Sequence, residues 1–420
     1  MSGSIDRRSV LKAGAVGIAF PSVIPSRILR EPPSGILNIG IIGFGIRSKN
    51  LLYQFLNAPS CRVVGIAEVV DARREEGLRR ARGHEKGREC KGYRDHRELL
   101  NAPGLDAVMI GTPDHQHAAP AIAACGLGRH VYCEKPLSRT LVEGRAMADA
   151  AEAAGVVFQT GSQQRTEFGQ HFVRGAELIR ADAIGRISKV EVGVGDPPIK
   201  DDLPEEDLPE GIDWNSWLGS SPERGFNHEL CPIGMHKHYP AWRKYREYAG
   251  GGLADMGAHH FDIAQWALGR DRSGPVRIIP PADPKSVRGL RMVYDDGIEL
   301  VHDGSIDCRF VGENGVIEAG RGYLRASDEK ILEFPVPEDI RLPRHRSHIL
   351  NWVNAIRGEE DTIAPAEVGH RTASICQLAA IGYELDGPLD WDPTTERFTG
   401  ARAESANALR DRPRRTALNG

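Results

Sequence analysis

The alternation of apolar and polar positions along residues 36–160 predicts a repeating pattern of strands and helices. Five apolar runs have the length of buried strands, at residues 36–42, 62–67, 105–110, 130–133 and 156–160. Three stretches between them carry apolar residues at helical spacing, at residues 46–56, 118–125 and 142–154. Strands that alternate with helices form a parallel, doubly wound sheet, so we expect a Rossmann-type domain over residues 35–160.

The pattern changes beyond residue 161, where a loop rich in proline and acidic residues spans 196–210. Between residues 276 and 326, short runs separated by Asp-Gly and Gly-Arg-Gly turns predict an antiparallel sheet. Amphipathic stretches at 348–356 and 367–385 are expected to cover one face of it. We therefore predict an α/β domain followed by an α+β domain over residues 161–390. The polar tail, 391–420, is expected to wrap the surface.

The first 34 residues differ from both domains, and we assign them to a signal and a linker. Arg7 and Arg8 precede the apolar stretch 13–24, which is too short to span a bilayer. The segment resembles a twin-arginine export signal, which implies a periplasmic protein without a stable membrane anchor after export. The twin-arginine translocase would be its partner during export. A frayed amphipathic helix is the alternative.

Composition and charge narrow the classes of partner. The 420 residues carry a formal net charge of −4, which gives no basic field for nucleic acid, so no nucleic-acid partner is expected. The seven cysteines are scattered without the paired spacing of metal sites and are expected to be small core residues. The histidine pairs 115/117, 236/238 and 259/260 diverge on a strand or helix, so we predict no metal site.

The turn GFGIRS at residues 43–48 stands between the first predicted strand and the first predicted helix. Gly43 and Gly45 permit a tight turn and let the backbone approach a pyrophosphate at the positive end of the helix. Glu68 follows the second strand, where a carboxylate binds the ribose hydroxyls of NAD and repels the 2′-phosphate of NADP. NAD is therefore favoured, although Arg47 and the pair Arg73-Arg74 leave NADP possible.

Two further segments end strands on the side where ligands bind to open α/β sheets. They are TPDHQH at residues 112–117 and EKP at residues 134–136, and the second places Lys135 where a nicotinamide would lie. A surface cation after a buried strand is the alternative for Lys135. The cofactor-binding residues predicted in this half of the chain are Gly43, Gly45, Ile46, Arg47, Glu68, Thr112, Pro113, His115, His117, Glu134, Lys135 and Pro136.

A second cluster follows the glycine run 250–252. Asp255 and His259 are four residues apart, so on a helix they share a face, and the aspartate can orient the imidazole. The alternative is a capping aspartate beside a core histidine. Together with Lys135 the pair predicts a catalytic site for a reaction that moves a proton.

These motifs, with GSQQR at 161–165 and GGGLADMGAHHFD at 250–262, resemble the Gfo/Idh/MocA family of sugar and cyclitol oxidoreductases. The resemblance implies hydride transfer at a sugar carbon, with Lys135, Asp255 and His259 as the catalytic residues. It also places Gln164 and Arg165 near the nicotinamide, and we expect Arg165 to contact the substrate. Ser48, where a glycine is usual, and the doubled His259-His260 depart from the family pattern.

We predict that His259, oriented by Asp255, takes the hydroxyl proton while Lys135 binds the reacting oxygen of a carbohydrate. The remaining candidates for substrate binding are His236, Tyr239 and His260, which together with His238 leave a redox-neutral glycosidase or lyase with tightly bound NAD open. A second alternative is a non-catalytic carbohydrate-binding protein that uses Trp214, Trp217, Trp242 and Tyr245. In the family the antiparallel sheet pairs with another subunit, so we expect a homodimer or homotetramer.

Overall fold

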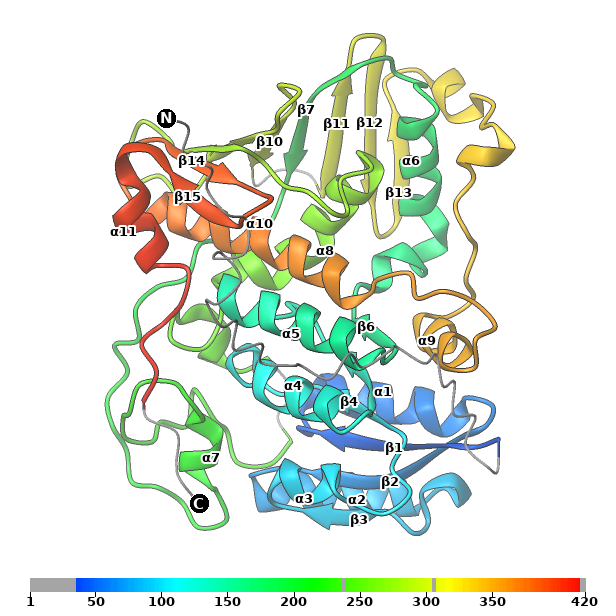
Figure 1. The fold of residues 1–420 in the computed structure, drawn as a ribbon, viewed down its shortest axis with the longest axis vertical. Coiled ribbons are helices and arrows are strands. Elements are labelled where there is room, and N and C mark those ends of the chain that lie inside the picture. The colour runs from blue at the N-terminus through cyan, green and yellow to red at the C-terminus, as the bar shows by residue number, and fades with distance from the viewer. Residues whose placement is uncertain (1–34, 236–238, 304–306, 416–420) are drawn as a thin grey trace, which may run out of the picture.

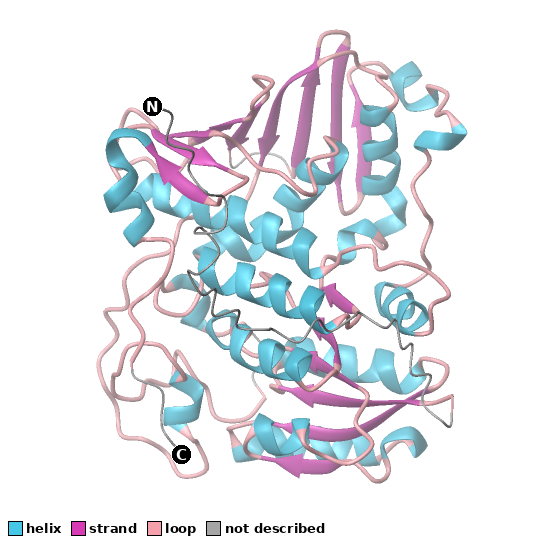
Figure 2. Cartoon of the chain, viewed as in Figure 1, coloured by secondary structure: helices cyan, strands magenta, loops and turns pink. Residues whose placement is uncertain are grey.

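The computed structural model describes residues 35–235, 239–303 and 307–415. Its two sheets lie at opposite ends of the molecule, with helices stacked between them (Figure 1). Figure 2 shows the same layering, with most of the helical residues gathered between the two sets of strands. The predicted signal at residues 1–34, His236 and His238 lie outside the described residues.

The N-terminal sheet has six strands in the order β3-β2-β1-β4-β5-β6, all parallel. The strands are β1 (Leu37–Ile42), β2 (Cys61–Ala67), β3 (Lys91–Tyr93), β4 (Ala107–Ile110), β5 (His130–Cys133) and β6 (Phe158–Thr160). The connecting helices are α1 (Ile46–Asn57), α2 (Asp71–Arg82), α3 (His96–Leu100), α4 (Ala118–Gly126) and α5 (Leu141–Ala154). This strand order reverses between β1 and β4, the point at which a doubly wound sheet binds its ligand.

The C-terminal sheet has nine strands in the order β13-β12-β11-β7-β10-β9-β8-β14-β15. Seven are β7 (Ile187–Val192), β8 (Arg277–Ile279), β9 (Arg291–Val293), β10 (Glu299–His302), β11 (Cys308–Gly312), β12 (Gly315–Gly320) and β13 (Tyr323–Ala326). Only the β7 and β10 pair is parallel among the described ladders, so the sheet is mainly antiparallel, as predicted. The core beneath it is formed with α6 (His171–Arg180) and α8 (Gly251–Ala267).

The tail predicted to wrap the surface instead extends this sheet. β14 (Leu389–Asp392) and β15 (Arg397–Thr399) form a hairpin at its edge, followed by α11 (Ala403–Ala408). Trp391 and Phe398 pack edge to face in the domain core, with ring centroids 4.8 Å apart. These two buried aromatic side chains explain why the segment folds with the domain, because their burial removes a large apolar area from water.

The helix predicted at 348–356 forms, but it does not cover the antiparallel sheet. α9 (His348–Ile356) packs on the Rossmann domain, where Trp352 meets Phe55 and Tyr132 in edge-to-face contacts. α10 (Ala366–Glu384) lies between the domains and packs against both α5 and α8 (Figure 1). Two helices from the C-terminal half of the sequence, α9 and α10, thus pack on the Rossmann domain, and α10 also packs on the C-terminal domain.

The loop segment that precedes α8 has a core of its own. Trp214 and Trp217 on α7 (Trp214–Leu218) stack with their centroids 4.6 Å apart, and Trp242 and Tyr245 are buried in the same cluster. Their side chains therefore do not offer a sugar-binding platform. All seven cysteines are buried and free, as expected of core residues. Among the described residues, no helix is long and apolar enough to cross a membrane.

Candidate active site

The glycine turn leaves the N-terminus of α1 open. Gly43 has φ of 79°, and a Cβ there would lie 2.8 Å from the backbone nitrogen of Thr112, so this position requires glycine. A Cβ on Gly45 would meet nothing within 4 Å, and no side chain caps α1. The first backbone N–H groups of the helix therefore face free space, which suits an anionic ligand.

Ser48 fits without loosening the turn. It is fully buried, and its hydroxyl lies 3.4 Å from the carbonyl oxygen of Gly111. A Cβ on Gly111 would come within 2.3 Å of that hydroxyl. Helix α1 can therefore pack closely despite Ser48, because Gly111, the residue after β4 that faces Ser48, has no side chain.

Glu68 lies at the carboxyl end of β2, where it was predicted. Its carboxylate accepts hydrogen bonds from the backbone N–H of Phe44 at 2.6 Å and of Val70 at 2.9 Å. Arg73 is buried and donates to the carbonyl oxygens of Pro232 and Gly234, while Arg74 binds Asp71. Both arginines are therefore engaged in contacts within the protein that hold the fold.

The segment 112–117 is fixed from beneath by its two histidines. The ring nitrogens of His117 lie 2.9 Å from the carbonyl oxygen of Pro136 and 3.0 Å from that of Thr112. His115 is buried between Trp217 and Tyr248, with Nε2 2.8 Å from the carbonyl oxygen of Trp217. The two histidines position the residues beside the ligand edge, and Thr112 and Pro113 remain partly exposed there.

Lys135 and Asp255 meet at the junction of the domains. Nζ of Lys135 donates to Oδ1 of Asp255 at 2.7 Å and to the Asp255 carbonyl oxygen at 2.6 Å. Burial alone raises the pKa of the Asp255 carboxyl, but the charges of Lys135 and Arg243 outweigh it and leave the pKa below its ordinary value. Asp255 therefore stays ionised and holds the ammonium group in place.

Glu134 anchors the neighbouring part of the site. Its Oε1 accepts hydrogen bonds from Nε of Arg47 at 2.9 Å and from Nε2 of Gln163 at 3.0 Å. The Glu134 carboxyl also fills the space where a Cβ of Gly161 would be, at 2.8 Å. The Arg47–Glu134 pair ties the start of α1 to the loop that carries Lys135, so the two predicted cofactor-binding segments lie at the same edge of the sheet.

His259 lies one helical turn beyond Asp255, but the two side chains do not bond. The Asp255 carboxylate pairs with Lys135, and Nδ1 of His259 is buried without a hydrogen-bond partner among the described residues. Burial, together with the charges of Lys135 and Arg321, holds the pKa of His259 well below its usual value. The predicted orientation of the imidazole by Asp255 is therefore wrong, while the neutral ring is suited to accept a proton.

Two residues predicted to contact the substrate, Arg165 and His260, instead make contacts within the protein core. All five N–H donors of Arg165, which is 1% exposed, are used by Asp262, Asp271 and the Ile363 carbonyl oxygen. His260 projects into the helix–sheet core, where Nδ1 lies 3.6 Å from Sγ of Cys308. Burial lowers the pKa of His260 to about 4. Both predictions are corrected, because neither side chain has a free polar group directed at Lys135.

Two arginines near the site, Arg243 and Arg321, were not predicted from the sequence. Gln164 is fully buried and links the His259 carbonyl oxygen, 3.2 Å away, to Nε of Arg321, 3.0 Å away. Arg243 stacks over Tyr239 at 4.6 Å and lies 3.7 Å from Asp255. Tyr239, on which Arg243 stacks, is 58% exposed. Arg321 stands between two glycines, a pattern that predicts a turn but does not indicate a charge beside Gln164.

The family models match both domains. Residues 37–162 match the model described as "Oxidoreductase family, NAD-binding Rossmann fold", and residues 198–419 match "Oxidoreductase family, C-terminal alpha/beta domain". The chain belongs to the Gfo/Idh/MocA oxidoreductase family. Membership confirms the predicted fold class and NAD as the cofactor. Within the described residues, no group of His, Cys, Asp or Glu side chains is arranged to hold a metal ion.

Several Gfo/Idh/MocA relatives are named sugar or cyclitol dehydrogenases. Myo-inositol 2-dehydrogenase of Thermotoga maritima is 25% identical over 71% of this chain and 72% of its own length. Levoglucosan dehydrogenase of Pseudarthrobacter phenanthrenivorans is 34% identical over 56% of this chain, but the match spans only 51% of that enzyme. The solved apo form of levoglucosan dehydrogenase superposes with a TM-score of 0.57 at 20% identity, over 84% of this chain and 98% of that one, which shows the shared fold.

The residues present fit NAD. The open N-terminus of α1 suits a pyrophosphate, and the carboxylate of Glu68 suits a ribose diol. We expect Glu68→Gln to reduce kcat/KM for NAD by roughly tenfold and to narrow the preference over NADP, because a neutral amide no longer repels a 2′-phosphate. Steady-state kinetics with both cofactors measures this ratio. Glu75→Gln, an exposed change of equal charge on α2, should leave the ratio unchanged.

Proposed function

We propose that this protein oxidises a secondary alcohol of a sugar, cyclitol or glycoside by hydride transfer to bound NAD. The observation that carries the proposal is the Lys135 ammonium, held 2.7 Å from Asp255 with the neutral His259 one helical turn away. Bound NAD would supply the hydride acceptor. The names of the relatives support this substrate class, with inositols and levoglucosan as the first compounds to test.

The proton chemistry follows from the charges of the site. His259 is neutral, so it can take the hydroxyl proton as the carbon loses its hydride. Lys135 donates a hydrogen bond to the same oxygen, on which negative charge develops as the proton leaves. Asp255 keeps the ammonium group oriented through two contacts, one from its side chain and one from its carbonyl oxygen. Asp255 thus acts on Lys135 rather than on the imidazole.

The test combines nucleotide release with a substrate panel. Mass spectrometry of nucleotide released from the purified protein identifies the bound cofactor. Absorbance of reduced nicotinamide is then followed while inositols, levoglucosan and simple glycosides are added. A lasting rise in reduced cofactor supports net oxidation, whereas release of an aglycone without a lasting rise contradicts it.

We also propose that the nine-stranded sheet pairs two copies of the chain. Its outer face is lined with ion pairs, among them Glu191 with Lys189 and with Arg309, and Arg291 with Glu299. Lys189, Glu191, Arg309 and Glu299 are partly exposed and Arg291 is exposed, so another copy would dock on a charge-balanced surface. We expect a dimer or tetramer in equilibrium sedimentation, with weaker association at high salt. A monomer at micromolar concentration would contradict the proposal.

A further inference from the structure

Asp114 is a buried carboxyl group that accepts no side-chain hydrogen bond from the described residues. It is 6% exposed, and neither of its carboxylate oxygens accepts a hydrogen bond from any described residue. A buried carboxyl is ordinarily paired or hydrogen-bonded, because desolvation of the charge is costly. Asp114 takes no part in proton abstraction by His259 or in the orientation of Lys135, and in the sequence it is one residue of the segment 112–117. Its isolation therefore requires a separate explanation.

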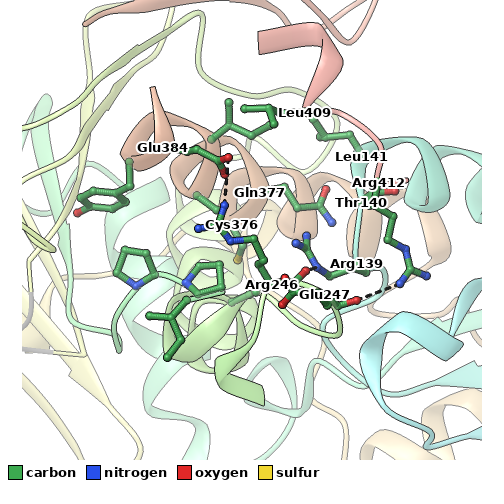
Figure 3. A pocket seen from close by; sticks show the side chains of 18 of the residues that line it. Arg139, Thr140, Leu141, Arg246, Glu247, Cys376, Gln377, Glu384, Leu409 and Arg412 are labelled. Atoms are coloured by element: carbon green, nitrogen blue, oxygen red, sulfur yellow. Dashed lines mark hydrogen bonds and ion pairs between the residues drawn. The ribbon is translucent and has the colours of Figure 1, made fainter. Parts of the chain in front are cut away.

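Asp114 lines a cavity of about 510 Å³. Pro136 and Ala254, the chain neighbours of Lys135 and Asp255, line the same cavity. α10 contributes a wall that includes Gln377 and Glu384, and Arg139 and Arg412 line other parts (Figure 3). Lys285 and Val287 are exposed at its rim. The cavity thus extends from the chain neighbours of the catalytic pair to solvent.

Five ionisable side chains interact electrostatically with Asp114: His117 from the turn before α4, Lys135 and Arg139 from the loop after β5, Arg243 from the turn before α8 and Asp255 from α8. Two uncharged thiols, Cys133 at the end of β5 and Cys376 on α10, also lie in its surroundings. Burial raises the pKa of Asp114 to about 6, although the charges of His117, Arg243 and Lys135 oppose it. Asp114 can therefore both gain and lose a proton near neutral pH.

We propose that Asp114 carries the proton released by alcohol oxidation from the catalytic cluster to water in this cavity. The inference rests on the proposed function, because each oxidation leaves one proton on the His259, Lys135 and Asp255 cluster. An N–H bond of Lys135 breaks as an O–H bond forms on Asp114. The proton that His259 took from the hydroxyl then passes to Lys135, so an N–H bond of the imidazolium breaks as the N–H bond of Lys135 forms again. Asp114 then loses its proton to water, so the cluster returns to its starting charge.

The position of the cavity supports this route. The front of the site is where substrate and cofactor would lie, and the proton cannot stay on His259, because Lys135 and Arg321 disfavour the imidazolium. A carboxyl that accepts no hydrogen bond from the described part of the chain and lines a cavity is poised to exchange protons, and its desolvation is a cost to stability. The cost and the location are both explained if Asp114 serves the reaction.

Asp114→Asn tests the role, because it keeps the size of the side chain and removes its ionisation. We expect kcat for oxidation to fall by about tenfold, less than for a residue that takes the proton directly from substrate. The rise of wild-type kcat through about pH 6 should disappear, and 50 mM imidazole buffer should restore turnover in the variant but not accelerate the wild type. KM and NAD affinity should stay unchanged. Glu384→Gln, which removes a cavity carboxylate remote from Lys135, is the matched control.

Two readouts do not depend on turnover. Infrared difference spectra between pH 5 and pH 7 should show a carboxyl band that is absent from Asp114→Asn. The variant should also be more resistant to urea than the wild type at pH 7. The raised pKa means that the folded wild type binds more protons than the unfolded chain between about pH 4 and pH 6, so stability falls with rising pH in that window. This dependence should be weaker in the variant.

The outcomes separate the two proposals. If the wild type oxidises none of the panel compounds, the proposed function fails, and the infrared titration still decides whether Asp114 exchanges protons. If the wild type is active and Asp114→Asn keeps its turnover and its pH profile, the relay is overturned. A variant that loses stability together with activity, and is not rescued by imidazole, shows a structural role instead and also overturns it.

Discussion

Lys135→Ala is expected to reduce turnover by about a thousandfold while NAD still binds. The ammonium group is the donor aimed at the reacting oxygen, and alanine removes both its charge and its hydrogen bond. The N-terminus of α1 and Glu68, which are suited to the rest of the cofactor, do not contact Lys135. Loss of activity without loss of affinity is therefore the signature of a group that acts mainly in the transition state.

The measurement pairs single-turnover absorbance of reduced nicotinamide with a fluorescence titration of NAD. Lys91→Ala, an exposed lysine on β3, is the matched control and should behave as the wild type. Asp255 keeps Arg243 at 3.7 Å in the variant and is 35% exposed, so removal of Lys135 leaves the carboxylate partly compensated and the fold intact. Near-normal turnover in Lys135→Ala with NAD bound would eliminate the assigned mechanism.

The sequence alone predicted that Lys135 lies close to Asp255 and His259, because two geometric rules apply to these positions. The carboxyl ends of parallel strands meet at one edge, and residues four apart share a face of a helix. Neither rule says which partner a side chain chooses. Asp255 bonds to Lys135, which lies 120 positions earlier in the sequence, rather than to His259, and a contact over that separation depends on how the two domains pack.

The same limit explains the corrected elements. The amphipathic pattern of α9 shows that one of its faces is buried, but not against which sheet, and Trp352 finds its pocket on the Rossmann side. Arg165 was placed near the nicotinamide by resemblance, yet its guanidinium turns to Asp262 and Asp271. A residue that is adjacent in sequence to a site residue lies near the site, but its side chain can point away from it. That Asp114 accepts no side-chain hydrogen bond among the described residues depends on how several elements pack, and it has no sequence signal.

Asp262→Ala is expected to lower the free energy of unfolding by about 3–5 kcal/mol. Asp262 is fully buried and accepts two hydrogen bonds from Arg165, both at 2.8 Å, and one from Thr372 at 2.9 Å. Burial alone lowers the pKa of Arg165, but the carboxylates of Asp262 and Asp271 outweigh it and raise the pKa. The guanidinium therefore stays charged, and the variant leaves a buried cation with only one of its two carboxylates.

The matched control is the second carboxylate on the same arginine. Asp271 is 29% exposed, so solvent replaces part of its contact, and Asp271→Ala should cost about 1 kcal/mol or less. Urea unfolding followed by tryptophan fluorescence measures both, since Trp266 stacks on Arg165 at 5.1 Å. Arg165→Met combined with Asp262→Leu should recover much of the loss, because a well-packed apolar pair replaces the ions without an uncompensated charge. Equal losses for Asp262→Ala and Asp271→Ala would show that burial does not set the strength of this pair.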